Sequence, residues 1–192
     1  MTGLGYAFTW LKAMAVGAWK VEPVVGAMPQ KVATAVGELG ETMLGAKYEP
    51  IAYLGSQLAN GVNHAVLAKQ TIVAGVDTVN VVLLKFSEKE MDCSLYAVEP
   101  VMQGGAAFGG FTVDPKAGKD IPEDAMKTFK DVTEGWVGVK LDPIALLGSK
   151  VTKGVDLVFL AKVTPVYPDA EATAKLVVVN GLTKTIDFVD VL

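Results

Sequence analysis

The sequence predicts an α+β fold made of two similar units, each with one helix packed on a curved antiparallel sheet. Two observations lead to this prediction. A long stretch of the first half of the chain is repeated in the second half, and each copy shows one helical run of apolar residues followed by four strand-like runs. A helix lying across a curved antiparallel sheet buries the apolar faces of both elements. The 192 residues are 51% hydrophobic, which suffices for a buried core.

The repeat holds a constant offset of 93 residues. Residues 47–56 (KYEPIAYLGS) and 140–149 (KLDPIALLGS) are identical or conservative at most positions, and the register continues to Gly61 and Gly154. A tandem duplication explains this pattern. The chain therefore divides into an apolar N-terminal segment (residues 1–15), a first unit (16–101), a Gly-rich linker (102–110) and a second unit (111–192).

Each unit has one segment with helical periodicity. In residues 29–45 the apolar positions recur every three or four residues, with Pro29 at the first helical position and Gly45 as the stop. In the second unit we expect Asp120 to cap a helix that begins near Pro122. The strand-like runs that follow are residues 50–57, 63–72, 79–86 and 94–98, and residues 143–150, 156–163, 174–179 and 185–191.

Composition excludes several function classes. All 17 cations are Lys and the net charge is -4, so the chain lacks both the Arg forks and the positive surface that nucleic-acid binding uses. No apolar stretch is long enough to predict a transmembrane helix. The apolar start of the chain has no cationic region before it and carries Lys12, so it is a poor signal peptide, which favours a cytoplasmic location.

The chain has few groups for catalysis or metal binding. His64 is the single histidine and Cys93 the single cysteine, which excludes an intramolecular disulfide and a cysteine metal cluster. We therefore predict no enzyme activity, no cofactor and no metal site. His64 is interpreted as a strand residue, Cys93 as an inert thiol, and the acidic residues before Pro in both units, Glu49 and Asp142, as strand-end groups.

The order strand, helix, four strands resembles the cystatin-like fold. Residues 57–64 (QLANGVNH) are similar to the cystatin first-hairpin motif Gln-x-Val-x-Gly, and residues 48–57 resemble small bacterial cystatin-like proteins of unassigned role. Two departures stand out: Ala59 replaces the Val of the motif, and no Pro-Trp pair is present for the second hairpin. The resemblance implies a binding site formed by Gly17, Gln57, Leu58, Ala59, Asn60 and Gly61.

Two function hypotheses follow. The first is a non-catalytic protein that binds a protein partner or self-associates, with the apolar segment of residues 1–15 attaching to another subunit. The apolar residues of this segment alternate as in a strand, and some of them also have the spacing of a helix. The residues expected to make the assembly contact are Tyr6, Phe8, Trp10 and Leu11. The alternative is a cysteine-protease inhibitor that uses the first hairpin, with weak inhibition expected because the Pro-Trp pair is missing. A hairpin that projects freely beside Gly17 favours protease inhibition. A hairpin buried against the other unit favours protein binding or self-association.

Overall fold

The structure is a computed structural model that describes residues 17–73, 78–104, 110–118 and 120–192. Within these ranges the chain forms ten strands and two helices. The first half contains β1 (Trp19–Val24), α1 (Gln30–Thr42), β2 (Ala46–Ala59), β3 (Gly61–Ile72), β4 (Thr78–Lys89) and β5 (Asp92–Met102). The second half contains β6 (Thr112–Val113), α2 (Glu123–Thr133), β7 (Val139–Thr152), β8 (Gly154–Pro165), β9 (Thr173–Asn180) and β10 (Thr185–Asp190).

The strands form two five-stranded antiparallel sheets. The first has the order β1-β2-β3-β4-β5 and the second β10-β9-β8-β7-β6. The 93-residue offset of the sequence also relates the registers, since Ala59 pairs with Gly61 in the first sheet and Thr152 with Gly154 in the second. Both long hairpins shift register shortly after a proline, at Pro50 and Pro143, because proline has no N–H to donate to the ladder.

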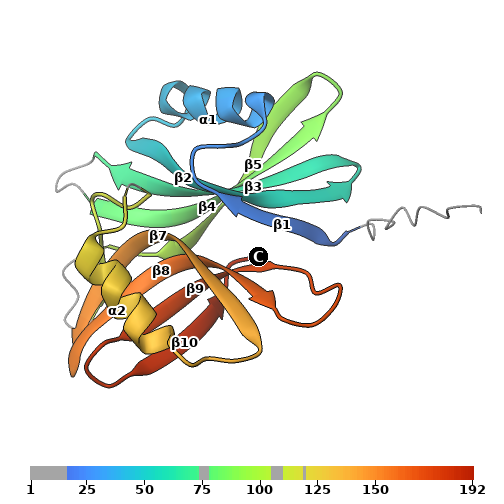
Figure 1. Cartoon of the computed structure of the whole chain (residues 1–192). Coiled ribbons are helices and arrows are strands. Elements are labelled where there is room, and N and C mark those ends of the chain that lie inside the picture. The colour runs from blue at the N-terminus through green and yellow to red at the C-terminus, as the bar shows by residue number, and fades with distance from the viewer. Residues whose placement is uncertain (1–16, 74–77, 105–109, 119) are drawn as a thin grey trace, which may run out of the picture.

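The main core lies between the two sheets. Eight buried residues from each half form it: Ile51, Ala52, Leu54, Ala65, Leu67, Val81, Leu83 and Met102, and Val113, Ala117, Ala145, Leu147, Val158, Leu160, Ala174 and Leu176. Figure 1 shows the first sheet stacked above the second. Each sheet therefore buries one face against the other sheet, as in a β-sandwich.

The predicted α+β class is therefore wrong. The described part of the chain is mostly β, with ten strands in two antiparallel sheets and only two short helices, rather than two units that each consist of one helix on a sheet. The physical reason is that the central strands are apolar on both faces. Six consecutive residues, His64 to Lys69, are buried in β3, and the four between them are apolar, so this strand needs a second covering layer in addition to a helix.

The short helices lie on the outer faces of the sheets. α1 buries Val32, Ala35, Val36 and Leu39 in a smaller core with β3 and β4, and α2 buries Ala125, Phe129 and Val132 against β8 and β9. α1 lies within the predicted 29–45 segment, but Pro29 is its N-cap rather than its first helical residue, and the helix ends at Thr42, before the predicted stop at Gly45. α2 begins after Pro122, and no side chain caps it, so the predicted capping by Asp120 is wrong.

The ends of the two halves take part in the packing. Met102 closes β5 and is buried in the core between the sheets, and the Gly104 N–H donates to Asn80 Oδ1 at 2.9 Å, so these two residues of the predicted linker are held in place. The rest of that linker, residues 105–109, and the N-terminal segment lie outside the described residues. No helix in the described ranges is long and apolar enough to span a membrane.

Candidate functional site

One end of the first sheet brings together the residues that the sequence singled out for binding. β1 pairs with β2 from Trp19 opposite Gln57, which places Gly17 at the tip of the β2–β3 hairpin. The Gly17 N–H donates to Leu58 O at 3.1 Å, and Gln57 Nε2 donates to Gly17 O at 2.7 Å. Asn63 Nδ2 in turn donates to Gln57 Oε1 at 2.9 Å, so Gln57 ties together three segments of chain.

Gly61 lets the hairpin approach its neighbouring strand. Its φ is +105°, and a Cβ at this position would lie 2.3 Å from Glu88 O. Only glycine tolerates both conditions. The β2–β3 turn therefore lies against the end of β4, beside the β4–β5 turn formed by Glu90 and Met91. We call Gly17, Gln57–Gly61 and Glu90–Met91 together the hairpin edge.

The hairpin edge is exposed and carries apolar side chains. Leu58 is 41% exposed and Met91 89%, while Ala59 and Asn60 are exposed at the turn. The hairpin thus projects beside Gly17 and is not buried against the second sheet, which is the outcome that favours the inhibitor alternative on this one criterion. Met91 is absent from the predicted binding residues; the signal for it in the sequence is a methionine directly after the charged run SEKE.

A cluster of polar side chains lies behind the hairpin edge. His64 is only 4% exposed, and its ring bonds Tyr53 Oη through Nδ1 at 2.9 Å and Glu88 Oε2 through Nε2 at 3.1 Å. Glu88 also accepts from Lys31 Nζ at 2.7 Å, and Lys31 donates to Glu90 O at 2.7 Å. The cluster therefore links α1 and three strands to the β4–β5 turn. The sequence did not predict it, because its members are far apart along the chain.

Ionisation in this cluster follows from its contacts. The hydrogen bond from Lys31 is the main cause that holds the pKa of Glu88 below its ordinary value; burial opposes this shift, and the bond with His64 adds to it. Since an ionised carboxylate only accepts, Nε2 of His64 carries a hydrogen and donates it to Glu88. Both ring nitrogens bond side chains of the protein and the ring is almost fully buried, an arrangement that positions the surrounding strands.

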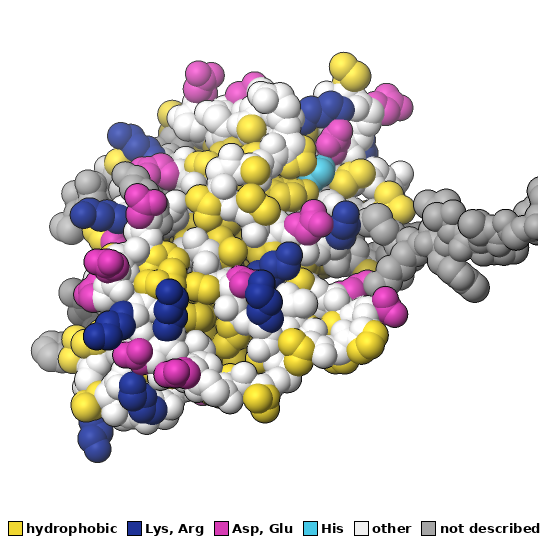
Figure 2. Space-filling view, in the orientation of Figure 1, with side chains coloured by type: hydrophobic (Ala, Val, Ile, Leu, Met, Phe, Trp, Pro, Cys, Tyr) yellow, Lys and Arg dark blue, Asp and Glu magenta, His cyan; other side chains and the backbone are white. Residues whose placement is uncertain are grey.

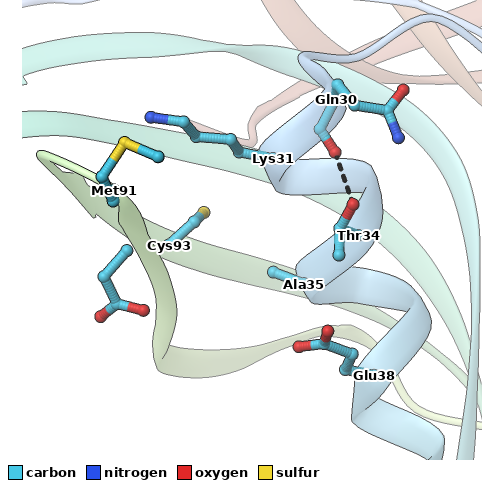
Figure 3. Close-up of a pocket in the computed structure, with 8 residues that line it drawn as sticks. Gln30, Lys31, Thr34, Ala35, Glu38, Met91 and Cys93 are labelled. Atoms are coloured by element: carbon cyan, nitrogen blue, oxygen red, sulfur yellow. Dashed lines mark hydrogen bonds between the residues drawn. The ribbon is translucent and has the colours of Figure 1, made fainter.

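A shallow pocket of about 300 Å³ lies between α1 and β5 (Figure 3). Met91 and Cys93 line it from the β5 side and Lys31, Thr34 and Glu38 from the helix. Burial raises the pKa of the Cys93 thiol, and the nearby Glu88 and Asp92 charges add to this effect. The thiol is therefore protonated near neutral pH, which agrees with its interpretation as an inert cysteine.

The two acidic residues before proline, Glu49 and Asp142, both form ion pairs. Glu49 does more than end a strand, because its carboxylate lies 2.7 Å from Lys69 Nζ, whereas Asp142 pairs with Lys140 at 2.8 Å. Among the described residues no group of three potential metal ligands occurs. The predicted assembly residues Tyr6, Phe8, Trp10 and Leu11 lie outside the described part of the chain.

No known protein family, curated protein or solved structure matches this chain.

Proposed function

We propose that the protein works by non-catalytic protein binding, with self-association as its simplest form. The observation that carries this proposal is that exposed aliphatic side chains occupy equivalent positions in the two halves. Leu44 and Val137 precede the glycines that open the long hairpins and are 93% and 90% exposed. Val73 and Val166, 46% and 68% exposed, lie beside them, because their N–H groups donate to Gly45 O and Gly138 O.

The hairpin tips show the same correspondence. Leu58 and Val151 are related by the 93-residue offset and are 41% and 81% exposed. Exposed apolar residues that occur singly need no explanation, but groups of them at strand ends are typical of protein contact sites. On the face shown in Figure 2, lysines and acidic residues are interspersed, with hydrophobic side chains between them. Such a mixed surface suits a protein partner better than a polyanion.

The polar groups support binding over chemistry. The only histidine is engaged on both ring nitrogens, and the described residues include no buried side-chain polar atom without a partner. A histidine that exchanges protons with a substrate must reach it, and His64 is only 4% exposed. The His64 cluster holds the β4–β5 turn instead, since Lys31 bonds both Glu88 and Glu90 O.

Sedimentation of the full chain over a range of concentrations tests the proposal. We expect concentration-dependent association that weakens in the double variant Leu44→Asp/Val137→Asp. The control is Thr34→Asp/Gln103→Asp, which adds the same two charges at exposed polar positions. A chain that stays monomeric at all concentrations, or a control that weakens association equally, would contradict self-association through these sites.

Cysteine-protease inhibition is the second candidate, and one observation favours it. Gly17, the β2–β3 turn and the β4–β5 turn lie together at one exposed end of the first sheet, which is the arrangement that the cystatin resemblance implies for a wedge. The Glu90–Met91 turn supplies no Trp, so we expect weak inhibition of papain at most.

Papain inhibition assays with two matched variants test this candidate. Leu58→Asp changes the hairpin edge, and Val151→Asp makes the equivalent change in the second half. Inhibition lost in the first variant and kept in the second would support the inhibitor. Gly61 is a poor site for this test, because any side chain there would collide with Glu88 O.

A further inference from the structure

The strand β10 has a free edge that differs from those of the other outer strands. It pairs with β9 over six consecutive residues without a register shift, and within the described residues no strand pairs with its other side. It contains no proline. β5, the corresponding strand of the first sheet, carries Pro100 and shifts register twice against β4, features that hinder pairing with a further strand.

An aromatic side chain lies beside this edge. Trp136, at the end of α2, is 47% exposed, and its ring centroid lies 5.6 Å from that of Phe188 on β10. Phe188 is half-buried against the α2 core, so the indole extends the apolar face of β10 outward. A half-exposed Trp beside a free strand edge is a suitable anchor for the apolar side chains of an added strand.

Charge argues against pairing between two β10 strands. β10 carries Asp187 and Asp190. Asp190 is ion-paired with Lys175 of β9, so Asp187 is the acidic charge that an antiparallel pair of β10 strands would bring close to its own copy. A strand without acidic residues avoids this repulsion. Residues 1–16 contain no Asp or Glu and one Lys, and their apolar residues alternate from Leu4 through Tyr6 and Phe8 to Trp10. This period of two is that of a strand with one apolar face.

The place where this segment begins favours a second molecule. Gly17 is bonded to Leu58 at the tip of the β2–β3 hairpin, so the preceding residues leave β1 at the end of the first sheet. A chain of 16 residues spans at most about 55 Å when extended. Because Gly17 lies at the exposed hairpin tip, a segment of this length is long enough to reach an edge strand of a neighbouring molecule.

We propose that residues 3–11 of one copy add as a strand to the free edge of β10 in a second copy, with Tyr6, Phe8 and Trp10 packed on Trp136. This inference rests on the proposed function and adds a second self-association contact to the exposed aliphatic groups around Leu44 and Val137, with both of its surfaces named. Each chain then offers one donor segment and one acceptor edge. Two copies that exchange segments form a closed symmetric dimer.

Complementation between two variants tests the proposal. A chain starting at Gly17 keeps the acceptor edge and lacks the donor, and full-length Trp136→Asp keeps the donor and has a damaged acceptor. We expect each alone to associate at least tenfold more weakly than the full chain, as for loss of an aromatic anchor. Mixed in equal amounts, they should form a one-to-one complex, because one intact contact remains.

The matched control is full-length Tyr96→Asp. Tyr96 is 52% exposed on the edge strand β5, so this variant places the same charge at an equivalent exposed aromatic and should associate as the wild type does. Circular dichroism confirms that each variant folds before its mass is measured. A Trp136→Asp chain that does not fold is replaced by Trp136→Ala.

Three results would overturn the inference. If the chain starting at Gly17 associates as strongly as the full chain, another surface carries self-association, and the proposed function survives. If the mixture forms no complex, the segment and the β10 edge are not partners. A full chain that stays monomeric, while removal of residues 1–16 from the Trp10→Phe/Trp19→Phe variant changes Trp136 fluorescence, shows that the segment binds its own molecule, and self-association then fails as well.

Discussion

At the scale of single residues, Lys69 joins the two halves of the molecule. It lies on β3, is 8% exposed, and donates to Pro115 O at 3.0 Å while its ammonium lies 2.7 Å from Glu49. Pro115 belongs to the segment between β6 and α2, so the bond crosses from the first sheet to the second half. A buried ammonium is stable only with partners of this kind.

We predict that Lys69→Met lowers the free energy of unfolding by about 1–3 kcal/mol, because Pro115 O and Glu49 lose their partner. Urea unfolding measures this. Lys85→Met is the control. Lys85 also lies on a strand of the first sheet, but its side chain is 22% exposed against 10% for Lys69, and its ion pair with Glu99 is partly solvated; such pairs contribute below about 1 kcal/mol. Equal losses in the two variants would contradict a special role for Lys69.

Glu88 makes stability depend on pH. Its pKa is lowered in the folded protein, so the folded state binds this proton less readily than the unfolded chain does. The contribution is complete above the unfolded pKa, about 4.3, and is lost as the pH falls through the lowered folded value. We predict that Glu88→Gln loses less stability than the wild type on acidification, measured by urea unfolding at a series of pH values. Glu41→Gln, an exposed change on α1, should behave as the wild type does.

At the scale of elements, local signals in the sequence predicted local structure. The periodicity and Pro29 located α1 to within a residue at its start, while Gly45 placed its end three residues too late; the predicted first hairpin is the β2–β3 turn. We did not predict that each sheet is covered by a helix on one face and by the other sheet on the other face. Uninterrupted apolar runs such as residues 81–84 do indicate burial on both faces. The His64 cluster could not be predicted from spacing, since strand register alone brings Tyr53, His64 and Glu88 together.

Two glycines in the first half should respond in opposite ways to alanine. Gly61→Ala should destabilise by about 1–3 kcal/mol, because its φ is +105° and the new Cβ would meet Glu88 O. Gly40→Ala should stabilise by up to about 1 kcal/mol, because Gly40 is exposed on α1 with nothing within 4 Å of its Cβ position. Thermal unfolding measures both. Destabilisation by Gly40→Ala, or neutrality of Gly61→Ala, would contradict this account of the two positions.

At the scale of the whole molecule, the core between the sheets joins the two halves into one cooperative unit. It takes eight buried residues from each half, and Trp19 of β1 packs at its margin. If either half unfolded alone, the inner face of the other sheet would be exposed to water. The free-energy cost of exposing such an area is high, so partial unfolding is disfavoured.

We therefore predict that two single-tryptophan variants unfold in urea at the same midpoint. Trp10→Phe/Trp136→Phe leaves Trp19 as a fluorescent probe of the first half, and Trp10→Phe/Trp19→Phe leaves Trp136 as a probe of the second. Leu160→Ala, placed in the shared core from β8, should remove about 2–5 kcal/mol and move both midpoints together. Val151→Ala, at an exposed hairpin position, should move neither. A Leu160→Ala shift confined to the Trp136 probe would show instead that the two sheets unfold independently.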